Sequence, residues 1–202
     1  MTGQLLFQVL IAPLVRFSSK SRLEQIMADY NLTANPHILS DSLEVASVNE
    51  PNVPDALTRF MPDVVLVNGT RIIKPNVLGC VEAPFINTHA GITPMYRGVH
   101  GGYWAMWNGE PDNFGATIHL VDPGVDTGQP LRQVRIRPSQ DDTFATYPLL
   151  QQAAALDDIR EIITDLSVAL DRMPATATSH ISRQWFHPTI GQYLIGRLRG
   201  IK

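Results

Sequence analysis

The stretch "FINTHAGITPMYRGVHGGYWAMWNGEP", residues 85 to 111, contains the pattern that best indicates the fold. An apolar run ends in Asn87, Thr88 and His89, and a proline, several glycines and a tryptophan-rich segment follow. The pattern predicts a strand over 83–89 and a helix closed by an Asn-Gly pair at 108–109. Because side chains alternate along a strand, Asn87 and His89 leave the same face. They are either strand-end residues with local hydrogen bonds or the start of an active site.

Apolar runs and helical patterns alternate on both sides of this stretch. The run 63–69 is almost wholly apolar, as in a buried parallel strand. Further strands are predicted over 42–49, 114–122 and 128–138, and helices over 4–30 (interrupted near Pro13), 53–63, 75–81 and 141–172, the last as one long or two shorter helices. The alternation predicts an α/β fold with an open, mainly parallel central sheet flanked by helices.

The order of the predicted strands and helices also sets the expected domain boundaries. We expect an α/β domain over 1–140, and a helical C-terminal region with a basic, aromatic tail over 141–202 packed on that domain. Residues 173–182 have the composition of a loop. An opening strand with a glycine-bearing turn, usual in open α/β domains, is not evident. Neither the G-x-G-x-x-G motif nor the G-x-x-x-x-G-K-[ST] motif occurs, so the sequence does not support a standard nucleotide-phosphate loop.

Composition excludes several classes of protein. The 202 residues are 44% hydrophobic and 17% charged with a net charge of -3, which favours a folded domain without general nucleic-acid binding. Cys80 is the single cysteine, so an intrachain disulfide and a multi-cysteine zinc site are excluded. The apolar stretch 5–15 is well short of the roughly 20 residues of a membrane span. We therefore expect a cytoplasmic protein with no membrane partner.

A third polar residue joins the pair at the strand end. Asp126 lies in "VDPGVDTGQ", residues 121 to 129, where Pro123, Gly124 and Gly128 predict a tight loop after a strand. If the two strands are neighbours, Asn87, His89 and Asp126 converge at the edge of the sheet where ligands bind. Asp126 is otherwise a turn residue.

The remaining polar and aromatic candidates have simpler interpretations. We interpret His119 as a strand residue and His187 and Trp185 as packing residues, and His100 stays ambiguous.

The motifs together resemble a known family. The segments 62–75, 85–110 and 114–131 resemble the 10-formyltetrahydrofolate-dependent formyltransferases, which include glycinamide ribonucleotide formyltransferase, methionyl-tRNA formyltransferase and the sugar-nucleotide N-formyltransferases. Asn-x-His, Pro-x-Tyr-Arg-Gly, Asn-Gly-Glu and Val-Asp-Thr-Gly occur in the family's order and spacing over about residues 60 to 137. The resemblance implies a formyltransferase-like fold and the catalytic residues Asn87, His89 and Asp126.

That assignment gives the three side chains a chemical purpose. An amine that attacks a formyl carbon produces an oxyanion, which the Asn87 amide and a protonated His89 would stabilise. Asp126 would orient the imidazole, favour its charged form or accept the proton of the amine. No ligand spacing suggests a metal.

The resemblance also implies where the formyl donor, 10-formyltetrahydrofolate, binds. The loop 68–73 and the segment 120–126 would form opposite walls of a pocket for the pterin ring. The donor-binding residues implied are Thr70, Arg71, Ile72, Ile73, Asp122 and Val125. Ile72 and Ile73 are equally well explained as core residues.

Departures from the family restrict which amine can accept the formyl group. The phosphate-holding first loop of the glycinamide ribonucleotide enzyme is not evident, and the C-terminal part is short for the β-barrel of the tRNA enzyme. We expect an N-formyltransferase that acts on a primary amine of a nucleotide-linked amino sugar. The alternatives are the glycinamide ribonucleotide enzyme of purine synthesis and a non-catalytic folate-binding remnant. The aromatic tail, Trp104 and Trp107 would suit a homodimer.

Overall fold

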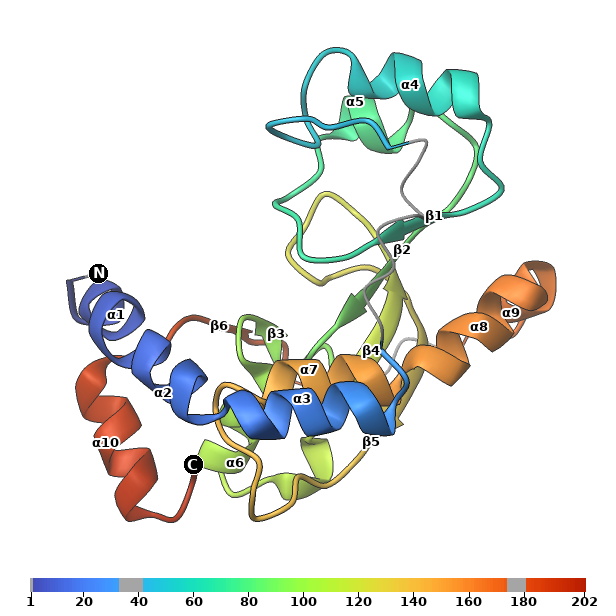
Figure 1. The fold of residues 1–202 in the computed structure, drawn as a ribbon. Helices are drawn as coiled ribbons and strands as arrows, with labels where there is room; N and C mark the ends of the chain where they lie inside the picture. The colour runs from blue at the N-terminus through green and yellow to red at the C-terminus, as the bar shows by residue number, and fades with distance from the viewer. Residues whose placement is uncertain (1, 33–41, 174–180) are drawn as a thin grey trace.

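The computed structural model describes residues 2–32, 42–173 and 181–202, and a four-stranded sheet forms its centre (Figure 1). The sheet has the order β1-β2-β4-β5, with bounds Val65–Val67, Phe85–His89, Gly115–Leu120 and Pro130–Arg135. The α/β class, with helices on the flanks of a central sheet, is confirmed. No strand precedes β1 in the described ranges.

The expectation of a mainly parallel sheet is wrong. β1 and β2 are parallel, but β2 pairs with β4, and β4 with β5, in antiparallel fashion. Parallel neighbours need a long crossover, whereas the loop 121–129 joins β4 directly to β5 as a hairpin. Composition alone did not reveal this, because a buried strand is apolar in either direction.

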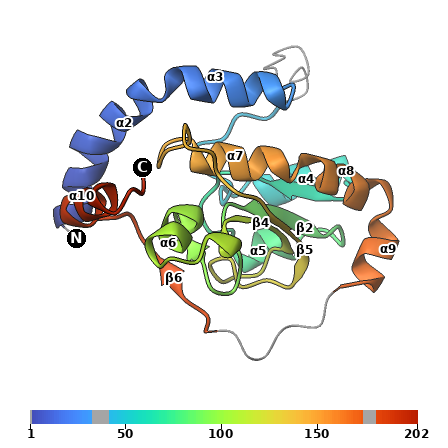
Figure 2. The ribbon, with the colours of Figure 1, turned by 90° about the horizontal axis from the view of Figure 1, so that it is seen from below.

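The helices lie around the sheet (Figures 1 and 2). α4 and α5 lie beside β1, and α7 lies between α3 and the sheet, while α1 lies against α10 near the two chain ends. The helices are α1 Thr2–Leu6, η1 Phe7–Ile11, α2 Ala12–Ser18, α3 Lys20–Asp29, α4 Val53–Phe60, α5 Pro75–Leu78, α6 Gly101–Trp107, η3 Pro111–Asn113, α7 Tyr147–Ala154, α8 Leu156–Thr164, α9 Leu166–Asp171 and α10 Ile190–Leu198.

Three local expectations need correction. The predicted strand 42–49 contains no strand, because its valines pack against α4 while Asn49 hydrogen-bonds the backbone of Ile72 and Lys74. The region 141–172 holds three helices, since the chain leaves helical geometry at Asp165 as well as after α7. α4 ends at Phe60, because Met61 takes a left-handed backbone conformation, so the predicted helix 53–63 is three residues too long.

The largest core cluster draws on both ends of the chain. Phe7 and Ile26 of the N-terminal helices pack with Tyr103, Phe144 and Tyr193, which come from α6, the loop before α7, and α10. Burial of these aromatic side chains fixes the terminal helices to the sheet domain. The division into 1–140 and 141–202 stays a prediction.

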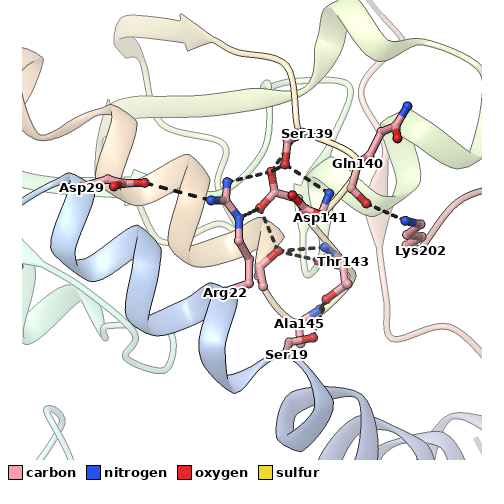
Figure 3. A network of polar contacts seen from close by, with 11 residues as sticks. Ser19, Arg22, Asp29, Ser139, Gln140, Asp141, Thr143, Ala145 and Lys202 are labelled. Atoms are coloured by element: carbon pink, nitrogen blue, oxygen red, sulfur yellow. Dashed lines mark hydrogen bonds and ion pairs between the residues drawn. The ribbon is translucent and has the colours of Figure 1, made fainter.

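A buried ion pair ties α3 to the same region (Figure 3). The guanidinium of Arg22 donates to both carboxylate oxygens of Asp142, whose side chain is 1% exposed, at 2.8 and 3.2 Å. Ser139 donates to Asp142 through its backbone N–H and its hydroxyl. Although burial raises the pKa of Asp142, the Arg22 and Ser139 contacts outweigh it and hold that pKa below its usual value. The carboxylate is thus the shared acceptor that fixes α3 to the 139–146 loop.

Within the described ranges, no helix combines the length and the apolar character needed to span a bilayer.

Candidate active site

Asn87 and His89 lie at the carboxyl end of β2, with their side chains on one face of the sheet. The antiparallel partner β4 places His119 directly opposite Asn87. The Nδ2 atom of Asn87 is 3.2 Å from the Nε2 atom of His119. Cross-strand pairing therefore brings a second imidazole to the site.

Asp126 reaches the same point by a route that the sequence did not predict. β4 runs antiparallel to β2, so its carboxyl end lies near the start of β2, and the loop 121–129 must fold back. Asp126 has a φ of +50°, a left-handed conformation that Asp tolerates better than most residues. Its carboxylate lies 3.4 Å from Nδ1 of His89 and 3.4 Å from Nδ2 of Asn87. The three side chains converge as expected, although the strand directions differ.

The hydrogen bonds of His89 fix which ring nitrogen faces Asp126. Nε2 of His89 lies 2.6 Å from the carbonyl oxygen of Tyr96, and a carbonyl only accepts, so Nε2 carries the proton. Nδ1 is then the atom that faces the carboxylate of Asp126. Burial lowers the pKa of His89, and the Asp126 charge and the Tyr96 carbonyl oppose that effect only in part. The neutral imidazole is thus favoured at neutral pH.

Asp126 is held in its ionised form. Burial raises the pKa of Asp126, but contacts with His119 and His89 in their protonated forms, together with the backbone N–H of Gly98, outweigh that effect, so the pKa of Asp126 is lowered. The Gly98 N–H donates to Oδ2 at 2.8 Å. A carboxylate anion beside a neutral imidazole is poised to stabilise the imidazolium that forms when the imidazole takes up a proton.

His119 was interpreted as a strand residue, and it is one, but it also belongs to the site. Its Nδ1 donates to the carbonyl oxygen of Leu120 at 2.7 Å, which leaves Nε2 to accept from the Asn87 amide. Both amide hydrogens of Asn87 thus face partners, His119 and Asp126, at long distances. Such contacts are weak, so the Asn87 amide can turn to a substrate at small cost. The sequence could place His119 in the site only if the antiparallel pairing of residue 119 with residue 87 were known, and the sequence does not reveal that pairing.

A cavity of about 610 Å³ opens over these side chains. Its size is within the range of sites for small organic ligands. Its lining includes the sequence-predicted residues Thr70, Arg71, Ile72, Ile73, Asn87, His89, Asp122, Val125 and Asp126. All nine predicted site residues therefore border one space.

The two predicted donor walls differ in character. Ile72 is 57% exposed and presents an apolar side chain, whereas Ile73 is buried in the core cluster with Val77 and Phe85. The Asp122 carboxylate accepts from the Gly124 backbone and the Thr127 hydroxyl, so it shapes its own loop. A flat ring would meet the Ile72 side chain on one side and the backbone of 121–125 on the other.

A third wall of the cavity was not predicted. Gln184, Trp185, Phe186 and His187 from the C-terminal tail line it, together with His100. His100 and His187 are joined through a 3.0 Å contact between ring nitrogens. Burial lowers the pKa of His100 to about 3 and also lowers the pKa of His187, so this wall is uncharged at neutral pH. The aromatic and polar tail composition was visible in the sequence, but its location was not.

Among the residues that the structure describes, no group of three or more His, Cys, Asp or Glu side chains is arranged to hold a metal ion.

Comparison with known proteins gives one family match. A protein family described as "Formyl transferase" matches residues 15–154, more than half of the chain.

Curated relatives match a shorter part of the chain. A methionyl-tRNA formyltransferase of Chlorobium chlorochromatii is 36% identical over 90 residues, which is 45% of this chain and 28% of that protein. Its counterpart in a Synechococcus species is 38% identical over 110 residues, covering 53% of this chain and 34% of that protein. The matched region therefore spans about a third or less of these relatives.

Solved structures share the fold. A sugar N-formyltransferase from a Shewanella species superposes with a TM-score of 0.57 at 21% identity, covering 86% of this chain and 72% of that chain. A 4-N formyltransferase from Francisella tularensis gives 0.53 at 19% identity, over 71% and 55% of the two chains. At these identities the likeness concerns the fold.

Proposed function

The chain belongs to the formyl transferase family, and from this premise we propose that it moves a formyl group from 10-formyltetrahydrofolate to a primary amine. The observation that carries the proposal is the convergence of Asn87, His89 and Asp126, linked by contacts of 3.4 Å, beneath one cavity. An amide donor, a neutral imidazole and an ionised carboxylate can together stabilise the oxyanion and move the proton in an acyl transfer between nitrogens.

The proposed reaction assigns one task to each side chain. The amine nitrogen attacks the formyl carbon, and the Asn87 amide donates a hydrogen bond to the oxyanion that forms. Nδ1 of His89 accepts the proton that the amine sheds, and Asp126 stabilises the resulting imidazolium. The carbon–nitrogen bond to the folate then breaks, and that nitrogen takes up the proton. His89 therefore starts neutral, in contrast to the protonated starting form expected from the sequence.

The donor is proposed to lie between the two walls at 70–73 and 121–125. The exposed side chain of Ile72 offers an apolar surface to the pterin ring, and backbone groups of 121–125 offer donors and acceptors to its edge. Arg71 is exposed on the same loop, where its guanidinium would suit the carboxylates of the folate tail. Thr70, Asp122 and Val125 complete the proposed donor site, Asp122 through its backbone.

The acceptor is proposed to be an amine on a nucleotide-linked amino sugar. It must approach from the side that the donor leaves free, where the tail wall lies. That wall, at 184–187, is outside the matched region 15–154, and the relatives named above differ in the acceptors that their names state. The ring of Phe186 is 57% exposed, and a nucleobase stacked on such a ring gains about 1–3 kcal/mol.

The test is a transfer assay with two amines, a nucleotide-linked amino sugar and glycinamide ribonucleotide, alongside calorimetric titration with tetrahydrofolate. We expect folate binding and faster transfer to the amino sugar. Faster transfer to glycinamide ribonucleotide would establish the purine-pathway alternative. Folate binding without transfer to either amine would establish a non-catalytic remnant, and absence of folate binding would refute the donor site.

The homodimer stays a proposal, but two of its supports are removed. Trp104 and Trp185 are buried within the aromatic core cluster, so neither ring is available to a partner chain. Analytical ultracentrifugation of the whole chain decides between monomer and dimer.

A further inference from the structure

Three consecutive residues, 96–98, hold His89 and Asp126 of the candidate site. The carbonyl oxygen of Tyr96 accepts from Nε2 of His89 at 2.6 Å, and the backbone N–H of Gly98 donates to Oδ2 of Asp126 at 2.8 Å. Between them, the guanidinium of Arg97 donates to the carbonyl oxygen of Val125 at 2.8 Å. The position of this segment therefore sets the distance between the imidazole and the carboxylate.

The backbone of the segment 96–98 is not paired with a strand of the four-stranded sheet. Its strand β3, Arg97–Gly98, pairs in parallel with β6, Gln184–Trp185, from the C-terminal tail. The backbone N–H of Arg97 donates to Arg183, and the backbone N–H of Val99 donates to Trp185, each at 3.1 Å. The tail thus supplies the backbone hydrogen bonds on both sides of Gly98.

Gly98 is required for this close approach. Its φ is +91°, and a Cβ atom built there would lie 2.3 Å from the carbonyl oxygen of Trp185. A side chain at this position would push β3 and β6 apart. The glycine at residue 98 therefore lets the tail strand lie directly against the segment that holds Asp126.

The Trp185 side chain fixes the tail strand in place. The indole is buried and stacks on Tyr96, with ring centroids 5.8 Å apart, and on Trp104 at 4.9 Å. Its Nε1–H donates to the carbonyl oxygen of Met95 at 2.9 Å, and the Arg183 guanidinium lies 3.8 Å above its ring. Trp185 is therefore in contact with the segment before, at and after Tyr96.

We propose that Trp185 is a positioning residue of the transfer site, acting on His89 and Asp126 through Tyr96 and Gly98. The inference rests on the proposed formyl transfer for its kinetic consequence, although the contacts themselves do not depend on it. It assigns to the tail a task separate from lining the cavity. The Trp185 indole is buried in the aromatic core cluster, whereas the neighbouring Phe186 is 57% exposed, and both residues border the cavity.

The kinetic consequence is a loss in turnover rather than in substrate binding. Without the indole, β3 is free to shift, and a displacement of about 1 Å at a catalytic group can cost on the order of 100-fold in rate. We expect Trp185→Ala to lower kcat by about 10- to 100-fold, with the KM for the folate donor changed less than about threefold. Trp185→Phe keeps the stacked ring and loses the Nε1–H, so its loss in kcat should be smaller.

Trp107→Ala is the matched control. Trp107 is in the same aromatic cluster, where its ring lies 5.9 Å from Trp104 and 6.2 Å from Tyr103, beneath the Arg199 guanidinium. It is not among the residues of the tail strand or of the 95–99 segment. A general loosening of the core would therefore affect both tryptophan variants, whereas loss of positioning affects Trp185→Ala alone.

Hydrogen exchange at the Gly98 amide gives a reading that needs no activity. The amide is hydrogen-bonded to Asp126, so it should exchange slowly in the wild type and in Trp107→Ala, and at least about 10-fold faster in Trp185→Ala. If Trp185→Ala fails to fold, Trp185→Phe takes its place in the same measurement, with a smaller increase expected.

Equal exchange and equal kcat in the Trp185 and Trp107 variants would overturn the inference. If the wild type transfers formyl to neither amine, the proposed function fails, yet the exchange rates still decide whether Trp185 positions the segment.

Discussion

The substitution Asp126→Asn removes one charge from the candidate site, together with the weak 3.4 Å contact in which Asp126 accepts from the Asn87 amide. Asn is nearly isosteric with Asp and tolerates the positive φ of residue 126. Its side-chain oxygen can still accept from the Gly98 N–H, which donates to Asp126 at 2.8 Å. A change in rate would therefore report the carboxylate charge beside His89 rather than a rearranged loop.

The distance between the two groups gives the size of the effect. Nδ1 of His89 and Oδ2 of Asp126 are 3.4 Å apart. Two unit charges at that distance attract by about 5 kcal/mol at an effective dielectric constant of about 20, and by about 1 kcal/mol in bulk water. The side chains are only 7% and 15% exposed, so the value lies toward the upper end of this range. If an imidazolium forms in the transition state, we expect a rate loss on the order of 100- to 1000-fold.

The sign of the pH effect follows from two opposing influences on the pKa of His89. Burial lowers the pKa of His89, and the Asp126 charge raises it, so removal of that charge lowers the pKa further. Because neutral His89 is the proposed base, the wild-type rate falls on the acid side, and this fall moves to lower pH in Asp126→Asn. The deficit of the variant should therefore be greatest above pH 7 and shrink toward pH 5.

Initial rates of formyl transfer between pH 5 and pH 9 measure both quantities, with the donor at saturation. Histidine NMR of the two proteins gives the pKa of His89 independently of any reaction. A ratio of variant to wild type that is constant across this range, or a loss of less than about threefold, would refute the assigned role of Asp126.

Two further comparisons test the structure around the site. In urea unfolding, Arg22→Met should lower the free energy of unfolding by about 2–4 kcal/mol, because Asp142 is left buried without its cation. Loss of the exposed ion pair between Arg137 and Asp112 should lower it by less than about 1 kcal/mol. Equal losses would contradict this expectation. The Arg22 effect should fade below about pH 4, since the lowered pKa of Asp142 makes this stability depend on its ionised form. A Cβ atom at Gly128 would lie 1.7 Å from the carbonyl oxygen of Leu120 in β4, so Gly128→Ala should lower the transfer rate at least about 10-fold. The control is Gly109→Ala, at a residue with a φ of +74° and open space around it. That variant should lower the free energy of unfolding by about 1 kcal/mol and leave the transfer rate unchanged.

The sequence predicted local features better than strand directions. β1 and β2 carry the short apolar runs that were assigned to them, and Pro75 and the Asn-Gly pair lie at the helix boundaries of α5 and α6. The antiparallel course of β4 was missed, because side-chain alternation is the same in both directions. The segment 42–49 was misassigned because its valines meet the requirement for burial by packing alone.

The candidate site shows the same division. Motif spacing identified Asn87, His89 and Asp126, which the structure brings together. It could not identify His119 or the tail wall at 184–187, because cross-strand register and the path of a distant tail have no local signature in the chain. Trp185 was interpreted as a packing residue, which its burial bears out, while its contacts with the 95–99 segment were not foreseeable.

The central claim is that His89 acts chemically in formyl transfer. The most direct test is single-turnover transfer of a labelled formyl group by the wild type and by His89→Ala, with folate affinity measured on the same samples. We predict that folate affinity changes by less than about threefold while the transfer rate falls by a factor on the order of 100 or more. A His89→Ala rate close to that of the wild type would contradict the account.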